Sequence, residues 1–289
     1  MAIFPPVDTK DATDVAAFVT QAFRRMFPGS SVDWLAALFR EVPAFFAGQH
    51  PDYAAADLRY HDLEHTLQAT ACLTLLLEGR HQSEVLPRLG TRHFELAMAA
   101  VLLHDTGYLK LRSDKVGTGA KYTFYHVLRS CAFAASYLPT LGANDLEIDV
   151  VLGAISCTGP TKELNHVHFR EPIGRMIGNA LATADYLGQM AAPDYPDRLE
   201  GLFSEFQESD EFLHVPPARR AFKSAADLIL RTPAFWRKFV LRKLEVDCQA
   251  MFRFLAHPYP NGSNPYLQAV ENNIAEISRR AAHPAIGVS

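Results

Sequence analysis

The chain has 289 residues, of which 48% are hydrophobic and 21% are charged, and its formal net charge is −4. This is the composition of an ordinary soluble protein, and the mild acidity gives no general argument for nucleic acid or an anionic membrane as a partner. No apolar run approaches the roughly 20 residues needed to cross a bilayer. No signal peptide is evident, and the four cysteines contain no CxxC pair, so a reduced, cytoplasmic setting fits best.

Nearly every segment has the apolar spacing of a helix, and none alternates as a strand does. A polar stretch near Gly117 and Gly119 predicts a mobile loop. We therefore expect an all-α fold, with a helical lead-in, a metal-binding core and a C-terminal helical extension packed on that core at residues 1–54, 55–195 and 196–289. The predicted helices, in chain order, cover residues 14–27, 32–46, 62–77, 94–103, 122–138, 145–156, 173–190, 198–208, 218–230, 234–255 and 266–280, and the loop covers 110–121.

The adjacent pair His104 and Asp105 ends a fully apolar helical run and is followed at once by Thr106 and Gly107. A carboxylate and an imidazole at the end of an apolar helix cost free energy unless a partner compensates them. Both side chains are ligands for hard or borderline divalent cations. A bound metal ion is therefore the partner that we expect.

Three further residues are candidates for the same site. His61 and His65 are separated by four residues, so on a helix they share one face, although such pairs also occur by chance on solvated faces. Asp185 lies within the apolar helical run 181–187. A carboxylate in the middle of a helix often faces solvent, but these neighbours leave little room for a wet face, and a buried carboxylate nearly always has a partner.

The order of His65, the His104–Asp105 pair and Asp185 along a helical chain resembles the HD superfamily of metal-dependent phosphohydrolases, over roughly residues 55–195. The segments at 125–130, 155–158 and 184–190 look like further motifs of its uncharacterised bacterial members. The resemblance implies an HD-domain helical bundle in which these four side chains hold one tightly bound divalent ion (Mg, Mn, Zn, Ni or Fe).

The first motif, Tyr60 to His65, is similar to that of cyclic-nucleotide phosphodiesterases, and this similarity would make His61 the general acid. Three departures concern the rest of the site. Asp62 replaces an Asn of that family, and Tyr108 stands where the family pattern would place another His. Cys157 and Thr158 occupy the region where two-metal members have a further His. A second ion therefore lacks an obvious full ligand set, although His126 could serve it or could bind substrate phosphate.

The implied reaction is hydrolysis of a phosphate ester of a nucleotide or other small phosphorylated metabolite by metal-activated water. Asp105 would bind the ion and accept a hydrogen bond from the attacking water. Asp62 either orients the His65 imidazole or stabilises a helix N-terminus. Other candidates for substrate contact, each also explained by an ordinary surface or core role, are Arg129, Thr158, Gln189 and the loop cations Lys110, Arg112, Lys115 and Lys121.

Two other functions use the same residues. A diiron oxygenase on this scaffold needs six protein ligands, of which five can be named when His126 is included. A non-catalytic sensor would bind a nucleotide without turnover, which the unusual Asp62, Tyr108 and Cys157 allow. The substrate cannot be read from the sequence, although Tyr60, Tyr108 and Gln189 are expected to shape its pocket. A homodimer is compatible with the aromatic C-terminal third.

Overall fold

The computed structural model describes residues 4–159 and 164–282, and within them the fold is all-α, as predicted. Extended pairing in these residues is limited to isolated bridges. The helices are α1 (Ala12–Met26), α2 (Asp33–Phe46), α3 (Leu63–Gln82), α4 (Thr91–Leu103), α5 (His126–Tyr137), α6 (Asp145–Ile155), α7 (Pro172–Met190), α8 (Tyr195–Phe212), α9 (Ala225–Phe235) and α10 (Pro265–Ala282). Short turns of other helical types used below are η1 (Thr106–Tyr108), η2 (Gly119–Tyr122), η6 (Trp236–Val240), η7 (Lys243–Asp247) and η8 (Met251–Leu255).

The predicted helix over 218–230 begins instead at Ala225. The reason is local, because the hydroxyl of Ser224 accepts a hydrogen bond from the backbone N–H of Asp227 at 3.1 Å and caps the first turn. A capping hydroxyl satisfies one of the backbone donors that a helix leaves free at its start. The prediction placed this start too early.

The predicted helix over 234–255 is divided in the structure. Helix α9 continues directly through the wider turns η6 and η7 and ends at Cys248. Gln249 and Ala250 then take the left-handed backbone, with φ of 54° and 51°, and η8 forms a separate turn. A helix of L residues cannot continue through this conformation, so two elements replace the single predicted one.

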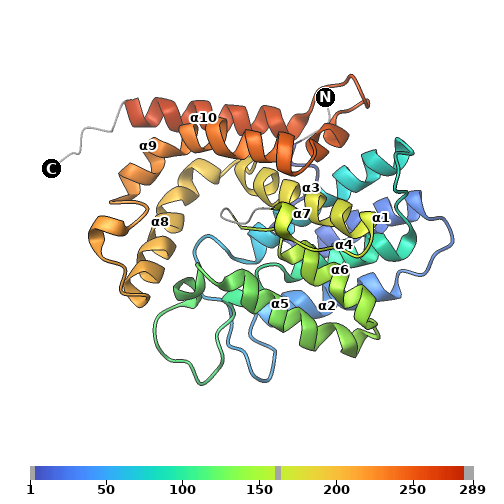
Figure 1. Ribbon diagram of the computed structural model, residues 1–289, viewed down its shortest axis with the longest axis horizontal. Helices are drawn as coiled ribbons and strands as arrows, with labels where there is room; N and C mark the ends of the chain where they lie inside the picture. Colours follow the sequence, from blue (N-terminus) through green and yellow to red (C-terminus); the bar gives the residue numbers. More distant parts are fainter. Residues whose placement is uncertain (1–3, 160–163, 283–289) are drawn as a thin grey trace.

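Helices α3 and α7 pack against each other at the centre of the molecule (Figure 1). Their close contact is at Gly188, where an added Cβ would lie 2.8 Å from the backbone of Ala69. Glycine lets the two backbones approach, since any side chain would separate them. His65 lies one turn before Ala69 in α3, and Asp185 lies one turn before Gly188 in α7. The glycine contact therefore brings these two side chains together.

The first turn of α3 is fixed by Asp62. Its Oδ1 accepts the backbone N–H of His65 at 3.0 Å, and its Oδ2 accepts a hydrogen bond from Arg198 of α8 at 2.7 Å. N-capping by an Asp side chain satisfies a backbone donor of the first turn. The turn that carries His65 is thus held both by its own cap and by a neighbouring helix.

The turn η1 lies directly against the start of α5. A Cβ at Gly107 would lie 2.0 Å from the carbonyl oxygen of His126, and the Gly107 N–H donates to the Ser130 hydroxyl at 2.8 Å. Only a residue without a side chain permits this approach. Because η1 follows Asp105 at once, the contact places His126 beside that carboxylate.

The hydrophobic core is one cluster that extends from Val15 in α1 to Ile277 in α10. Helix α10 packs against both α7 and α9 (Figure 1), so the C-terminal helices share the core of the central ones. The division into three segments stays a prediction. None of the helices in the described part of the chain is long and apolar enough to cross a membrane.

Candidate metal centre

Three helices bring together a buried group of His65 (α3), His104 (the residue after α4) and Asp185 (α7) that could hold a metal ion. One ligand atom from each of these residues lies within 4.8 Å of the other two. Two imidazoles and a carboxylate at this separation are a donor set that binds divalent transition metals. The fold therefore brings three of the four predicted ligands into one group.

Asp105 completes the cluster. Its Oδ2 lies 3.3 Å from His65 Nε2 and 3.4 Å from His104 Nε2. On the other side, Asp185 Oδ1 lies 3.2 Å and 3.6 Å from the same two nitrogens. Each imidazole nitrogen thus faces two carboxylates, an arrangement in which a shared cation would neutralise both.

Buried donor atoms of the cluster lack hydrogen-bond partners, as expected of atoms that bind a metal ion. His104 Nδ1 donates to the carbonyl oxygen of Val101 at 2.6 Å, so its Nε2 presents a lone pair to the cluster. Neither this Nε2 nor Asp105 Oδ2 makes a hydrogen bond with the described residues, although both are buried. Buried polar atoms without a partner are rare and costly, and a backbone acceptor on the second imidazole nitrogen is typical of metal-binding histidines.

The electrostatics of the cluster also favour a cation. Burial alone lowers the pKa of His65, but the close contacts with the negatively charged Asp105 and Asp185 outweigh it and raise that pKa to about 10. Burial raises the pKa values of both carboxyl groups, yet the facing imidazoles hold them well below their ordinary range. The site therefore keeps two negative charges and stabilises positive charge between them.

His126 lies on the other side of Asp105, with its Nε2 3.6 Å from Asp105 Oδ1. Its Nδ1 donates to the carbonyl oxygen of Thr123 at 2.7 Å. Burial lowers the pKa of His126, although the Asp105 charge acts in the opposite direction. A neutral imidazole held in this way presents a lone pair, which suits a cation or a water proton better than a phosphate oxygen.

His61 lies at the partly exposed side of the cluster, and Glu205 of α8 orients it. Its Nδ1 is 2.6 Å from Glu205 Oε2, while Glu205 Oε1 accepts the backbone N–H groups of Arg59, Tyr60 and His61 at 3.0, 2.6 and 3.3 Å. The side chain of Glu205 is only 3% exposed. Burial raises the pKa of this carboxyl group, but His61 and the backbone donors lower it below its ordinary value.

Glu205 was missed by the sequence analysis. Its neighbours Phe203 and Phe206 place a carboxylate among apolar residues, which is the signal that identified Asp185. Helix α8 is otherwise largely polar, so this signal did not stand out from a solvated helix face.

Tyr108 contacts both His61 and His126, whose own ring centroids are 6.2 Å apart. Its ring stacks on that of His61 with centroids 4.8 Å apart, and on that of His126 with centroids 4.5 Å apart. The side chains of His61, Asp185 and His126 are 15, 13 and 13% exposed, whereas those of His65, His104 and Asp105 are 3% exposed or less. A small molecule would reach the cluster from this side.

Gln189 supports Asp185. Its Nε2 donates to the Asp185 carbonyl oxygen at 2.9 Å and to Asp185 Oδ1 at 3.2 Å. Its Oε1 accepts the hydroxyl of Tyr60 at 2.6 Å. The amide thus links the segment before α3 to the carboxylate of α7 and fixes the orientation of that carboxylate.

Several other predicted contacts are different in the structure. Asp62 caps the backbone of α3, so its role at the helix N-terminus is the one observed, and it makes no described contact with the His65 imidazole. Arg129 is neither a surface ion pair nor directed at the cluster, because its guanidinium donates to the carbonyl oxygens of Gly107 and Leu109. The hydroxyl of Thr158 donates to a backbone carbonyl of its own turn.

Three of the four loop cations predicted to contact phosphate are engaged with other groups of the protein. Lys110 pairs with Asp57 at 2.9 Å, and the buried Lys121 pairs with Asp114 at 2.6 Å. Arg112 donates to backbone carbonyls of the segment after α2. An acid from another segment thus holds Lys110, an acid of the same loop holds Lys121, and backbone carbonyls hold Arg112.

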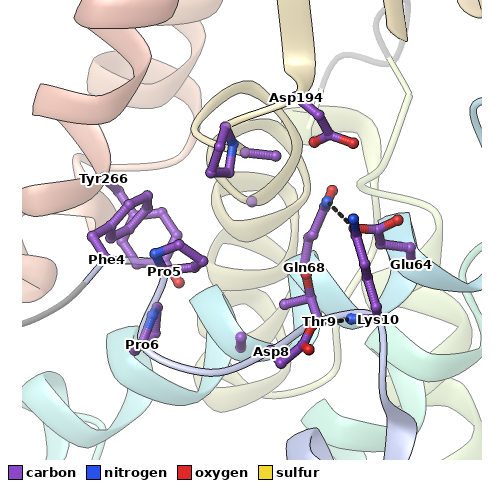
Figure 2. A pocket seen from close by; sticks show the side chains of 14 residues that line it. Phe4, Pro5, Pro6, Asp8, Thr9, Lys10, Glu64, Gln68, Asp194 and Tyr266 are labelled. Carbon is purple, nitrogen blue, oxygen red and sulfur yellow. Dashed lines mark hydrogen bonds between the residues drawn. The ribbon is translucent and has the colours of Figure 1, made fainter. Parts of the chain in front are cut away.

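Figure 2 shows a cavity of about 160 Å³ that lies between the N-terminal segment and helices α3 and α7. A smaller cavity of about 10 Å³, with room for at most about one water, is lined by Tyr60, His65 and Gln189. Gln68 and Ala192 line both cavities, so the two are neighbours. Tyr60 and Gln189, but not Tyr108, thus line the small cavity beside His65.

Comparison with known proteins gives no assignment, since no protein-family model and no curated protein matches the chain.

Proposed function

We propose that this chain is a metal-dependent hydrolase that cleaves a phosphate ester of a nucleotide or another small phosphorylated metabolite. The observation that carries the proposal is the convergence of two buried imidazoles and two buried carboxylates, beside a third imidazole held by Glu205. The order of these residues, which resembles that of the HD superfamily, supports the same function.

The residues proposed to hold the ion are His65, His104, Asp105 and Asp185. A divalent ion bound there would lower the pKa of a coordinated water from about 15.7 toward 7 and polarise a phosphoryl oxygen. The protein's contribution is to fix four donors in a water-poor site that opens on one side.

His61 is the proposed proton donor to the leaving oxygen. Its Nδ1–H is held by Glu205, which leaves Nε2 as the nitrogen that gives up a proton. The carboxylate stabilises the charged imidazolium, and its three backbone hydrogen bonds prevent it from turning away. Positioned proton transfer of this kind contributes about 10²–10⁴ in rate.

Asp105 is proposed to act on both of its sides. Oδ2 faces the imidazoles of His65 and His104, while Oδ1 faces His126 and is free to accept a hydrogen bond from the attacking water. The lone pair of His126 suits a second, weakly held cation better than substrate phosphate.

A metal and substrate screen tests the proposal. The full chain, loaded with Mg, Mn, Zn, Ni or Fe, is assayed on nucleotides and on p-nitrophenyl mono- and diesters of phosphate. We expect turnover that Asp105→Asn abolishes and that Asp149→Asn, at an exposed carboxylate away from the cluster, leaves unchanged. A fully metallated protein that is silent across the panel would contradict the proposal. Tight nucleotide binding without turnover would instead favour the sensor.

A further inference from the structure

One segment, residues 216–243, carries a local excess of positive over negative charge. It contains eight lysines and arginines and a single acid, Asp227, so it carries a charge of +7 while the rest of the chain carries −11. The net charge of −4 hides this asymmetry. A local concentration of one sign creates a surface potential that attracts partners of the opposite sign.

Helix α9 and its continuation through η6 and η7 present part of this charge on one exposed face. Two rows with a spacing of four residues run along it, so neighbouring side chains lie one turn apart. The face consists of Arg231, Phe235 and Phe239 in one row and Lys238, Arg242 and Val246 in the other, and we call it the basic–apolar face.

The apolar members of this face are exposed without an evident structural reason. Phe235 and Phe239 are 40% and 37% exposed and stack on each other with centroids 5.1 Å apart, and Val246 is 62% exposed. The opposite side of the same helix carries the core residue Trp236, whose indole N–H donates to Glu271 of α10 at 2.7 Å. The helix is thus anchored to α10, beside which it lies in Figure 1, and directs its second apolar surface outward.

Two of the three cations of the basic–apolar face are available to a partner. In residues 4–159 and 164–282, no ion pair engages Lys238 or Arg242. Arg231 pairs with Asp227 of its own helix at 3.6 Å and donates to the Ala221 carbonyl oxygen at 2.6 Å. Glu245 is the exposed acid nearest in sequence to this face. This differs from the 110–121 loop, where Asp57 and Asp114 neutralise Lys110 and Lys121.

We propose that the basic–apolar face docks on an anionic lipid bilayer, with the cations at the headgroup phosphates and Phe235, Phe239 and Val246 in the interface. Apolar side chains flanked by Lys and Arg on one helix face are the pattern of interfacial membrane helices. A two-fold contact of this face with a second copy would oppose like charges. Nucleic acid would need aromatic faces for stacking, but the two phenylalanines stack on each other and valine cannot stack.

Vesicle co-sedimentation of the full chain tests the proposal. We expect binding to phosphatidylcholine vesicles containing about 30% phosphatidylglycerol, weak binding to phosphatidylcholine alone, and loss of binding as salt shortens the Debye length. The triple variant Arg231→Gln/Lys238→Gln/Arg242→Gln should bind about 100-fold more weakly, at roughly fivefold per cation. The variant Val246→Ser should weaken binding by a smaller factor and leave its salt dependence unchanged.

The matched control is Arg24→Gln/Arg88→Gln/Lys115→Gln, which removes the same charge at exposed sites on other elements. It should bind anionic vesicles within about twofold of the natural chain, since these sites lie outside the face. Three results would overturn the proposal: equal loss in the control variant, equal binding to vesicles without anionic lipid, or no binding by the natural chain. Sedimentation velocity and RNA binding are measured in parallel. A dimer or an RNA complex that only the α9 triple variant disrupts, without vesicle binding, would assign the face to that partner instead.

Discussion

Replacement of Glu205 by Gln tests the proposed proton donor without touching a metal ligand. A Gln side chain keeps the oxygen that accepts the three backbone N–H groups of Arg59, Tyr60 and His61. It replaces the oxygen that lies 2.6 Å from His61 Nδ1 with an NH₂ group. Two donors then face each other unless the imidazole gives up its Nδ1 proton, so the contact that orients His61 for proton transfer is lost.

The expected loss follows from this one contact. If His61 is the proton donor, kcat should fall about 100-fold or more, toward the full value of general acid catalysis, while KM changes little. The hydrogen bond to a charged group contributes about 1.5–3 kcal/mol to stability, so the free energy of unfolding at neutral pH should fall by that amount. Nitrogen NMR of the imidazole should show that Nδ1 has lost its proton.

The stability loss should depend on pH. Because His61 and the backbone donors hold the pKa of Glu205 below its ordinary value of 4.5, its contribution is present above about pH 4.5. It disappears as the pH falls through the lower folded-state pKa. The difference in unfolding free energy between the natural chain and Glu205→Gln should therefore be constant near neutral pH and shrink in acid.

The matched control for this experiment is Glu208→Gln. Glu208 lies on the same helix one turn later and accepts hydrogen bonds from the backbone and hydroxyl of Thr118, away from the cluster. The Glu208→Gln variant should have a lower free energy of unfolding than the natural chain but the same kcat. Retention of full kcat and of the Nδ1 tautomer by Glu205→Gln would refute the role assigned to His61.

Three further substitutions test how the fold builds the site. Gly188→Ala should push α7 away from the backbone of α3. The unfolding temperature, measured by calorimetry, and the metal affinity, measured by metal titration, should both fall. Unchanged affinity would show that this contact does not set the distance between the ligands. Asp62→Ala should lower the free energy of unfolding by about 1 kcal/mol in chemical denaturation, with no change in metal content. A loss of metal would instead support the prediction that Asp62 orients the His65 imidazole. Gln189→Leu should weaken metal binding by about 10- to 100-fold in competition with a chelator, an effect that would be absent if its bond to Asp185 were incidental.

The predicted ligands could be found in the sequence because each carries its own local signal. His104 and Asp105 end an apolar helix, and Asp185 interrupts one. The free-energy cost of burying each of these polar side chains has to be offset by a partner, so each one indicates a site. The helices themselves follow from apolar periodicity, and the errors fall at ends set by one side chain or one backbone angle, as at Ser224 and Ala250.

The contacts that could not be predicted join residues far apart in the chain. Glu205 reaches His61 across 144 positions, and Asp57 pairs with Lys110 from the segment between α2 and α3, with no pattern near either partner to indicate the contact. Composition also averages over the molecule, which is why the net charge gave no sign of the basic segment before α10. Pairings of this kind depend on the tertiary arrangement alone.

The measurement that tests the central claim most directly is the metal content per chain of protein purified without chelator. We predict about one divalent ion per chain in the natural protein, with Asp185→Asn and His104→Ala reduced to a small fraction of that content while still folded by circular dichroism. Asp62→Ala, which removes the cap of α3 and the pairing with Arg198 but no proposed ligand, should keep its ion. A natural chain free of metal, or variants that keep the full content, would contradict the account, and two irons per chain would favour an oxygenase.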